Sequence, residues 1–361
     1  MKSRDEIRKE ALAVTKEYRQ CGVHVATGGG KTFIGLSHMN DLFQENGRFL
    51  VVAPKLSIRK EWIAEASKHG LEHLSGFMDF STYLSLDKQS HNYTAIYLDE
   101  CHSLKDSHDE WLSNYKGIIL GLTGSPPRFK TSEKGRMVYK YCPIVYTYET
   151  DNAVDDKILN DYRIIVHKIP LGKTNTVKVT TKTKTWFNSE ENIYNYWTKR
   201  IDEASSGKEL SMMRVMRMRA MMEFPSKEIL ASKILHSNTD KILLFANTQD
   251  QADKFKILSC HSNNPKSEEN LERFKSGNVK KLSCVHQLSE GINIPDLRIG
   301  IIMHAYGNER KLTQRLGRLL RLPPDQCSII HVLCHADTVD EEWVRSALKD
   351  FDKSKITWVE E

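Results

Sequence analysis

The feature that most constrains this chain is a glycine-rich stretch at residues 26–32, Ala-Thr-Gly-Gly-Gly-Lys-Thr. An apolar run, residues 22–25, precedes it, and apolar residues at helical spacing follow from Phe33 to Met39. A strand, a glycine turn and a helix start predict a phosphate cradle, because backbone N–H groups and the positive end of the helix converge on one anion. The residues expected to line it are Thr27, Gly28, Gly29, Gly30, Lys31 and Thr32.

The stretch matches the nucleotide-binding pattern G-x-x-x-x-G-K-[ST] except at Val25, which stands where the pattern has its first glycine. In a loop of this kind Lys31 reaches the β- and γ-phosphates of a nucleotide, and the Thr32 hydroxyl holds Mg²⁺. The competing interpretation is a glycine turn that only joins a strand to a helix. Motifs further along the chain favour the nucleotide site.

Length and composition restrict the class of protein. A chain of 361 residues predicts about two domains, and 39% hydrophobic with 28% charged residues is typical of a globular protein. The net charge of +6 suits a polyanionic partner without requiring one. Seven cysteines without a C-x-x-C pair indicate reduced thiols. No leader or membrane span is evident, so we expect a cytoplasmic monomer with no membrane partner.

Continuous apolar runs alternate with helical segments in both halves of the chain. Such alternation predicts parallel sheets covered on both faces, an α/β fold. Strands are expected in the first half at 48–54, 93–98 and 117–122, and in the second at 241–246, 282–288, 298–303 and 328–333. Helices are expected at 57–68, 249–258, about 311–320 and 339–351.

The pattern changes between the two halves. Residues 163–169 and 177–186 alternate like a β-ribbon, and a methionine-rich helical region follows. The second stretch carries Lys178, Lys182 and Lys184 among threonines. We therefore expect a first lobe that contains the glycine-rich loop at residues 1–150, a connector of β-ribbon and helices at 151–225, and a second lobe at 226–361.

Polar residues stand where two of the expected strands end. Asp99, Glu100 and His102 follow the strand at 93–98, and Thr123 and Ser125 follow the strand at 117–122. Ligand-binding groups of open α/β sheets gather at the carboxyl ends of strands. These residues are therefore expected to lie near the glycine-rich loop.

Six stretches together resemble the motifs of superfamily 2 helicases and translocases of the DExH kind. They stand in the family's order at residues 26–32, 99–102, 122–126, 245–248, 289–295 and 314–321. The resemblance implies two tandem RecA-like parallel-sheet domains with an inter-lobe cleft, and the near-minimal core is similar to UvsW-like phage recombination helicases. Residues 4–8 lack the glutamine that reads adenine in many relatives, which leaves the base of the nucleotide open.

The resemblance also implies roles. Asp99 and Thr32 would hold Mg²⁺ beside ATP, and Glu100 would deprotonate the attacking water. Transition-state charge would be stabilised by Lys31 and by arginine fingers, Arg318 and Arg321, with Gln314 facing the nucleotide. Coupling to the cleft would involve His102, Thr123 and Ser125. Nucleic-acid backbone contacts, independent of base sequence, would come from Pro54, Lys55, Arg59, Thr82, Thr248 and Gly291.

Three functions remain open on this reasoning. The first is an ATP-driven helicase or translocase acting on nucleic acid, with DNA favoured over RNA. The second is an ATP-gated nucleic-acid clamp that does not separate strands. The third, a P-loop kinase or GTPase, gives no role to Arg318 and Arg321.

Overall fold

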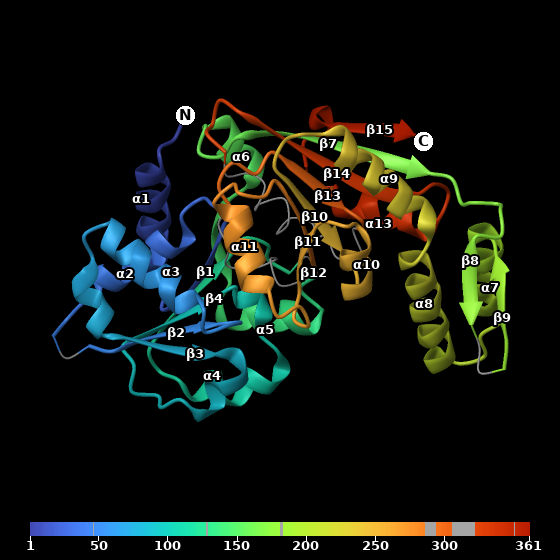
Figure 1. The fold of residues 1–361 in the computed structure, drawn as a ribbon. Helices are drawn as coiled ribbons and strands as arrows, with labels where there is room; N and C mark the ends of the chain where they lie inside the picture. The colour runs from blue at the N-terminus through green and yellow to red at the C-terminus, as the bar shows by residue number, and fades with distance from the viewer. Residues whose placement is uncertain (46, 128, 181–182, 286–293, 305–321, 350) are drawn as a thin grey trace. The chain divides into compact units, whose positions relative to one another are not determined.

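The computed structural model describes residues 1–361 apart from 46, 128, 181–182, 286–293, 305–321 and 350. The chain divides into two compact units, one made mainly of residues 1–161 and the other mainly of residues 162–361. Figure 1 labels their helices and strands. In the described residues, no helix has both the length and the apolar character needed to cross a membrane.

The first unit contains a six-stranded sheet in the order β3-β2-β4-β5-β1-β6. All of its strand pairs are parallel. The strands are β1 (Gln20–Val25), β2 (Phe49–Ala53), β3 (Met78–Thr82), β4 (Ala95–Asp99), β5 (Ile118–Thr123) and β6 (Ile144–Tyr148). The α-helices are α1 (Arg4–Thr15), α2 (Lys31–Asp41), α3 (Ile58–Lys68), α4 (Asp109–Asn114), α5 (Glu133–Tyr141) and α6 (Thr150–Asp155), with short 3₁₀ turns η1 (Glu72–Gly76), η2 (Tyr83–Lys88), η3 (Cys101–Ser103) and η4 (Asp106–His108).

Both faces of this sheet are buried, which explains why its central strands read as unbroken apolar runs. Leu50 and Ile96 face a core completed by Trp111 of α4 and Val138 of α5. Successive side chains of a strand point to opposite faces, and on the other face Tyr97 packs against Trp62 of α3. The functional groups are therefore confined to the rim where the strands end.

The second unit contains a seven-stranded sheet in the order β11-β12-β10-β13-β14-β7-β15. The strands from β11 to β14 are parallel to their neighbours, and β7 is parallel to β15. Its strands are β7 (Asp161–Ile169), β10 (Ile242–Ala246), β11 (Leu258–Cys260), β12 (Lys281–Val285), β13 (Ile299–Ile302), β14 (Cys327–His335) and β15 (Ile356–Glu360). The helices packed with it include α9 (Pro225–Ser237), α10 (Gln249–Lys254), α11 (Ser267–Lys275) and α13 (Val339–Ala347), with the turn η6 (Lys353–Lys355).

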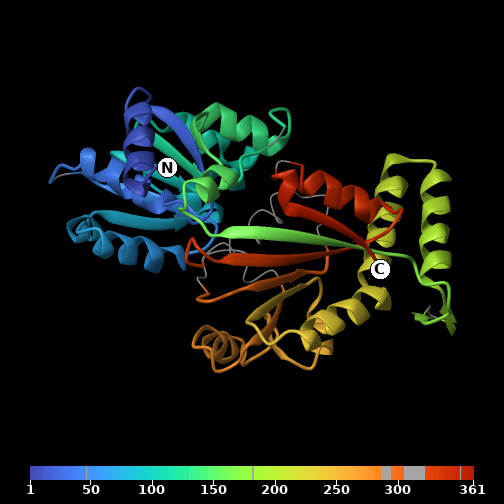
Figure 2. The same ribbon diagram turned by 90° about the horizontal axis from the view of Figure 1, so that it is seen from above.

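A small module within the second unit differs from the expected connector. The ribbon was expected to pair residues 163–169 with 177–186, but the first of these stretches is β7 and lies in the large sheet. The ribbon instead consists of β8 (Val177–Thr180) and β9 (Thr185–Asn188), which pair antiparallel. The helices α7 (Glu190–Asp202) and α8 (Gly207–Met222) follow it in the chain, and Val177 and Val179 of the ribbon pack against Ile193, Met221 and Phe224. Figure 2 draws the ribbon at the end of this helix pair.

Two parallel-sheet units confirm the predicted fold class. The strands expected at 48–54, 93–98 and 117–122 correspond to β2, β4 and β5, and those expected in the second half to β10, β12, β13 and β14. The helix expected at about 311–320 lies outside the described residues.

Candidate active site

The glycine-rich loop joins the end of β1 to the start of α2. Gly28 and Gly30 have φ angles of 90° and 99°, which glycine adopts readily and other residues rarely do. At Gly29 an added Cβ would lie 2.8 Å from Val25 Cγ1. The first backbone N–H groups of a helix have no intrahelical partner, and no described side chain caps the first turn of α2. The loop is therefore shaped to receive an anion.

The Lys31 side chain ends against the acidic turn that follows β4. Its Nζ lies 3.0 Å from Glu100 Oε1, and the two side chains are only 11% and 21% exposed. Glu100 has φ 51° and ψ 53°, a left-handed conformation that costs a residue other than glycine about 1–3 kcal/mol. Strain of this kind is tolerated where it aims a side chain, and here it brings the carboxylate to Lys31.

Asp99 is held from two sides by residues that sequence reasoning did not assign to it. Trp62 Nε1 donates to Asp99 Oδ2 at 3.0 Å, and the Tyr83 hydroxyl donates to the Asp99 carbonyl at 2.8 Å. The signal available in the sequence was the tryptophan itself, because a buried indole N–H usually finds a partner.

Burial, followed by the adjacent Glu100 charge, raises the pKa of Asp99 to about 6, although Lys31 and Trp62 oppose the rise. A divalent cation at this carboxylate would offset both effects. Carboxylate oxygens are also ligands that Mg²⁺ accepts. The residues present therefore fit the expected metal.

His102 connects the acidic turn to the turn that follows β5. Its Nδ1 lies 3.3 Å from Glu100 Oε2 and 2.8 Å from Thr123 Oγ1. Thr123 Oγ1 also accepts the Ser125 backbone N–H at 3.1 Å. Ser125 Oγ is buried and has no hydrogen-bond partner among the described residues. The three residues expected to couple the sites thus form one polar chain that reaches Glu100.

Gly124 brings this second turn against the glycine-rich loop. An added Cβ at Gly124 would lie 2.7 Å from Thr27 Oγ1 and 2.9 Å from Lys31 Nζ. His24 lies on β1 opposite Thr123, and sequence reasoning did not single it out. Burial and then the Lys31 charge lower the pKa of His24 to about 4. His24 is therefore neutral at pH 7 and leaves Lys31 as the cation at the loop.

Four residues expected to contact nucleic acid lie at the carboxyl ends of β2 and β3. Pro54 and Lys55 follow β2, and Thr82 ends β3 beside Ala53, its register partner. Arg59 lies in the first turn of α3, with its guanidinium carbon 5.8 Å from the centre of the Phe80 ring. The structure therefore brings these residues to the same edge of the sheet as the glycine-rich loop.

The other expected site residues belong to the second half of the chain. Thr248 is the N-cap of α10, where its side chain accepts the Gln251 N–H at 3.1 Å. That capping bond is enough to explain a threonine at this position. The remaining expected residues, Gly291, Gln314, Arg318 and Arg321, lie outside the described residues.

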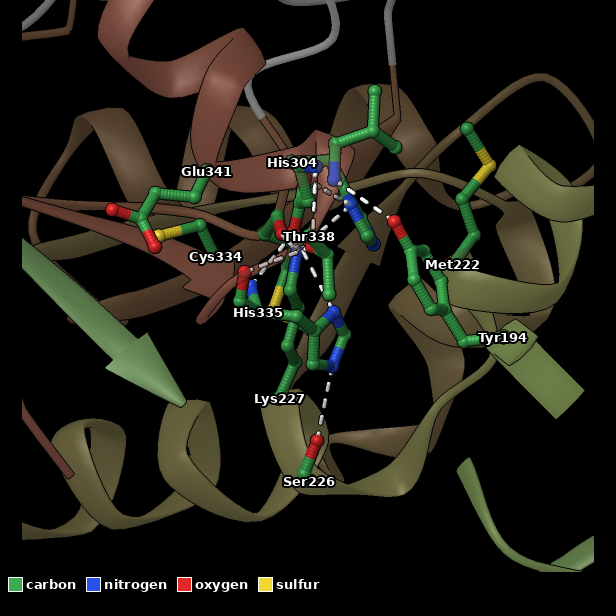
Figure 3. Close-up of polar contacts among 12 residues, drawn as sticks. Tyr194, Met222, Ser226, Lys227, His304, Cys334, His335, Thr338 and Glu341 are labelled. Atoms are coloured by element: carbon green, nitrogen blue, oxygen red, sulfur yellow. Dashed lines mark hydrogen bonds and ion pairs between the residues drawn. The ribbon is translucent and has the colours of Figure 1, made fainter. Parts of the chain in front are cut away.

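The second unit contains a buried polar cluster that sequence reasoning missed. Lys227 of α9 and Asp340 of α13 are 1% and 0% exposed and lie 2.5 Å apart. Lys227 Nζ also donates to the Met303 carbonyl at 3.0 Å and lies 2.9 Å from His304 Nδ1. Figure 3 shows Lys227, His304 and His335 in this cluster. Asp340 in turn accepts the His335 backbone N–H at 3.0 Å. The cluster joins two helices to the ends of β13 and β14.

Charge in this cluster is balanced by the pair itself. Burial alone would raise the pKa of Asp340, but Lys227 and then the two histidines lower it well below its ordinary value. Burial lowers the pKa of Lys227, and Asp340 opposes that shift. The pair is therefore an ion pair surrounded by protein on all sides, and each partner depends on the other.

Two family models match this chain. The model "Type III restriction enzyme, res subunit" covers residues 3–79, which include the glycine-rich loop, and "Helicase conserved C-terminal domain" covers residues 225–323. Both halves of the chain are therefore similar to segments of superfamily 2 helicases.

Similarity extends to proteins of distant sequence. The chain is 20% identical to "DNA 3'-5' translocase XPB2" of Sulfurisphaera tokodaii, over 90% of this chain and 80% of that protein. A structure of the restriction-modification enzyme LlaBIII bound to DNA matches with a TM-score of 0.64 at 14% identity, over 100% of this chain and 31% of that one. S. cerevisiae Dbp5 bound to RNA and ADP BeF3 matches with a TM-score of 0.59 at 11% identity, over 98% and 89%. The structural matches show two RecA-like lobes.

Buried histidines should make the second unit sensitive to acid. Burial, together with Lys227 for His304 and His167 for His331, lowers the pKa of each to about 4. Unfolded histidines take up protons below about pH 6.5, so between pH 6.5 and 4 protons favour the unfolded chain. We expect the urea concentration at which the β13 and β14 amides lose half of their protection from deuterium exchange to fall as the pH falls from 6.5 to 4. His331→Asn should make the fall shallower, and a constant midpoint would contradict the expectation.

Proposed function

We propose that this protein is an ATP-driven translocase or helicase that moves on DNA. The observation that carries the proposal is the convergence of Lys31, Glu100 and Asp99 at the glycine-rich loop, with 3.0 Å between Lys31 Nζ and Glu100 Oε1. The matches to the two family models, over residues 3–79 and 225–323, support the same activity. The name of the relative XPB2 supports DNA as the track and 3′–5′ as the direction. The likeness of the motifs to UvsW-like phage recombination helicases also favours DNA.

Each group at the loop has a task in this proposal. The first N–H groups of α2 and the turn at Gly28 and Gly30 receive the phosphates. Bound Mg²⁺ supplies charge neutralisation at the γ-phosphate. Lys31 exchanges the Glu100 carboxylate for phosphate oxygens, which frees Glu100 to orient the attacking water and take its proton.

The polar chain from Glu100 through His102 to Thr123 offers a path from the nucleotide to the turn after β5. Loss of the Lys31–Glu100 contact on ATP binding would change the charge beside His102. We propose that this change is what His102, Thr123 and Ser125 transmit. The motif at residues 314–321 supports a role at the γ-phosphate for Gln314, Arg318 and Arg321.

Lys55, Arg59 and Thr82 are proposed to hold the nucleic-acid backbone, with Pro54 shaping the turn. They lie at the same edge of the sheet as the ATP loop. Contacts of this kind go to phosphates and sugars and carry no base sequence. Movement would then follow from cycles of ATP binding and hydrolysis, on any DNA sequence.

The proposal is tested by the ATPase rate of the full chain against single-stranded, duplex, forked and branched DNA and matching RNA. We expect DNA to raise kcat severalfold or more and RNA to raise it less. A parallel strand-displacement assay separates the two candidate activities, because a clamp would show stimulated hydrolysis without displacement. An ATPase rate that no nucleic acid changes would contradict the proposal.

A further inference from the structure

The antiparallel ribbon of β8 and β9 has two faces of opposite character. In an antiparallel pair, residues directly opposite each other share a face. Lys178 lies opposite Phe187, and Val179 lies opposite Trp186. The two pairs therefore point to opposite sides of the ribbon.

The inner face of the ribbon is packed. Val177 and Val179 lie against the cluster formed by Ile193, Met221 and Phe224 of the neighbouring helical segment. This packing holds the ribbon against the helices, and Figure 1 draws β8 and β9 beside α7. The face that carries Lys178 and Phe187 is therefore held outward by a hydrophobic base.

The outer face combines an exposed aromatic ring with positive charge. Phe187 is 59% exposed and lies directly opposite Lys178. Trp186, which has the Lys184 ammonium 5.8 Å from its ring centre, belongs to the other side of the ribbon with Val179. In sequence, residues 173–189 contain four lysines and neither aspartate nor glutamate. An exposed ring beside a lysine, in a segment of one charge sign, offers a contact surface for an anionic ligand that has apolar faces.

A ligand for this face must be polyanionic and must offer flat apolar surfaces. Unpaired nucleotides meet both needs, since lysines contact the phosphates and bases stack on aromatic rings. A paired duplex keeps its base faces inside the stack and would leave Phe187 without a contact. An apolar protein surface would leave the lysines without partners.

We propose that the outer face of the β8–β9 ribbon binds single-stranded nucleic acid, with Phe187 stacking on a base and Lys178 contacting a phosphate. This inference rests on the proposed function, because it names a further contact with the strand on which the motor acts. The site lies in the second unit, apart in sequence from the residues at the ends of β2 and β3.

The test measures binding of the full chain to fluorescent oligo-dT by anisotropy, without ATP. Phe187→Ala should raise Kd about 5- to 150-fold, since stacking contributes about 1–3 kcal/mol per base, and Phe187→Tyr should restore binding. Lys178→Ala should reduce the slope of log K against log salt by about 0.7, the value for one phosphate contact on a single strand. Matched controls on α7 are Tyr196→Ala, which removes a ring 57% exposed, and Lys199→Ala, each of which should leave Kd and slope within about twofold of the original.

Failure of this inference differs from failure of the proposed function. If the unaltered chain binds oligo-dT and its ATPase responds to DNA, but Phe187→Ala and the lysine variant bind as before, only the ribbon site is wrong. If the unaltered chain shows neither response, the motor proposal fails first. A Phe187→Ala defect confined to blunt duplex, or to vesicles of anionic lipid, would also overturn the inference.

Discussion

Replacing Lys31 by alanine should lower the ATPase kcat at least about a hundredfold. Lys31 is the cation of the glycine-rich loop, and loss of one group that stabilises developing charge typically costs about 10²–10³ in rate. The side chain is only 11% exposed and lies 3.0 Å from the Glu100 carboxylate, so water cannot easily replace it. Steady-state hydrolysis with saturating DNA measures the effect.

Two further variants define what Lys31 does. Lys16→Ala removes a lysine that is 60% exposed and paired with Asp41 at the surface, and it should leave kcat unchanged. Glu100→Gln should abolish turnover while keeping nucleotide affinity, because the amide retains the shape but cannot take a proton. An ATPase rate in Lys31→Ala equal to that of the original chain would place the active site elsewhere.

Replacing Asp340 by alanine should lower the free energy of unfolding of the second lobe by about 3–5 kcal/mol. The change leaves the Lys227 ammonium without its carboxylate, and removing one partner of a buried pair strands a charge in a medium that cannot solvate it. Both side chains are at most 1% exposed. The loss of unfolding free energy is measured by urea unfolding, with deuterium exchange of the α9 and α13 amides as the signal.

The control removes both partners. Lys227→Met with Asp340→Leu should recover most of the stability, because a buried pair replaced by apolar residues of similar size is often neutral. Lys254→Ala breaks a pair with Glu228 in which the lysine is 54% exposed, and it should cost less than about 1 kcal/mol. A double variant as unstable as Asp340→Ala would contradict the explanation that the loss comes from an unpaired Lys227 charge.

Sequence reasoning succeeded where a short stretch carries its own structure. The loop between β1 and α2 needs glycine at Gly28 and Gly30 for reasons of backbone geometry, and that requirement is local. The strands β2, β4 and β5 read as apolar runs because both faces of the sheet are covered. The acidic pair at Asp99 and Glu100 could then be assigned to a strand end by adjacency alone.

Short helices and strands, and the pairing of strands within a sheet, were harder to predict from the sequence. A single helix was expected at 249–258, but α10 ends at Lys254 and β11 begins at Leu258. The alternation of residues 163–169 correctly predicted a strand but did not predict the sheet to which it belongs. Alternation shows that a strand has two different faces, and it carries no information on which strand lies beside it. That strand pairs with β15, almost two hundred positions later in the chain.

The sequence by itself determined the α/β class, the two-sheet organisation and the loop built to receive an anion, because apolar periodicity and turn residues within short stretches indicate each of them. Only the tertiary structure decided which distant side chains meet. Trp62 orients Asp99 from 37 positions away, and Lys227 meets Asp340 across 113. Pairs of this kind leave no local pattern, since burial and charge compensation act between groups that the fold brings together.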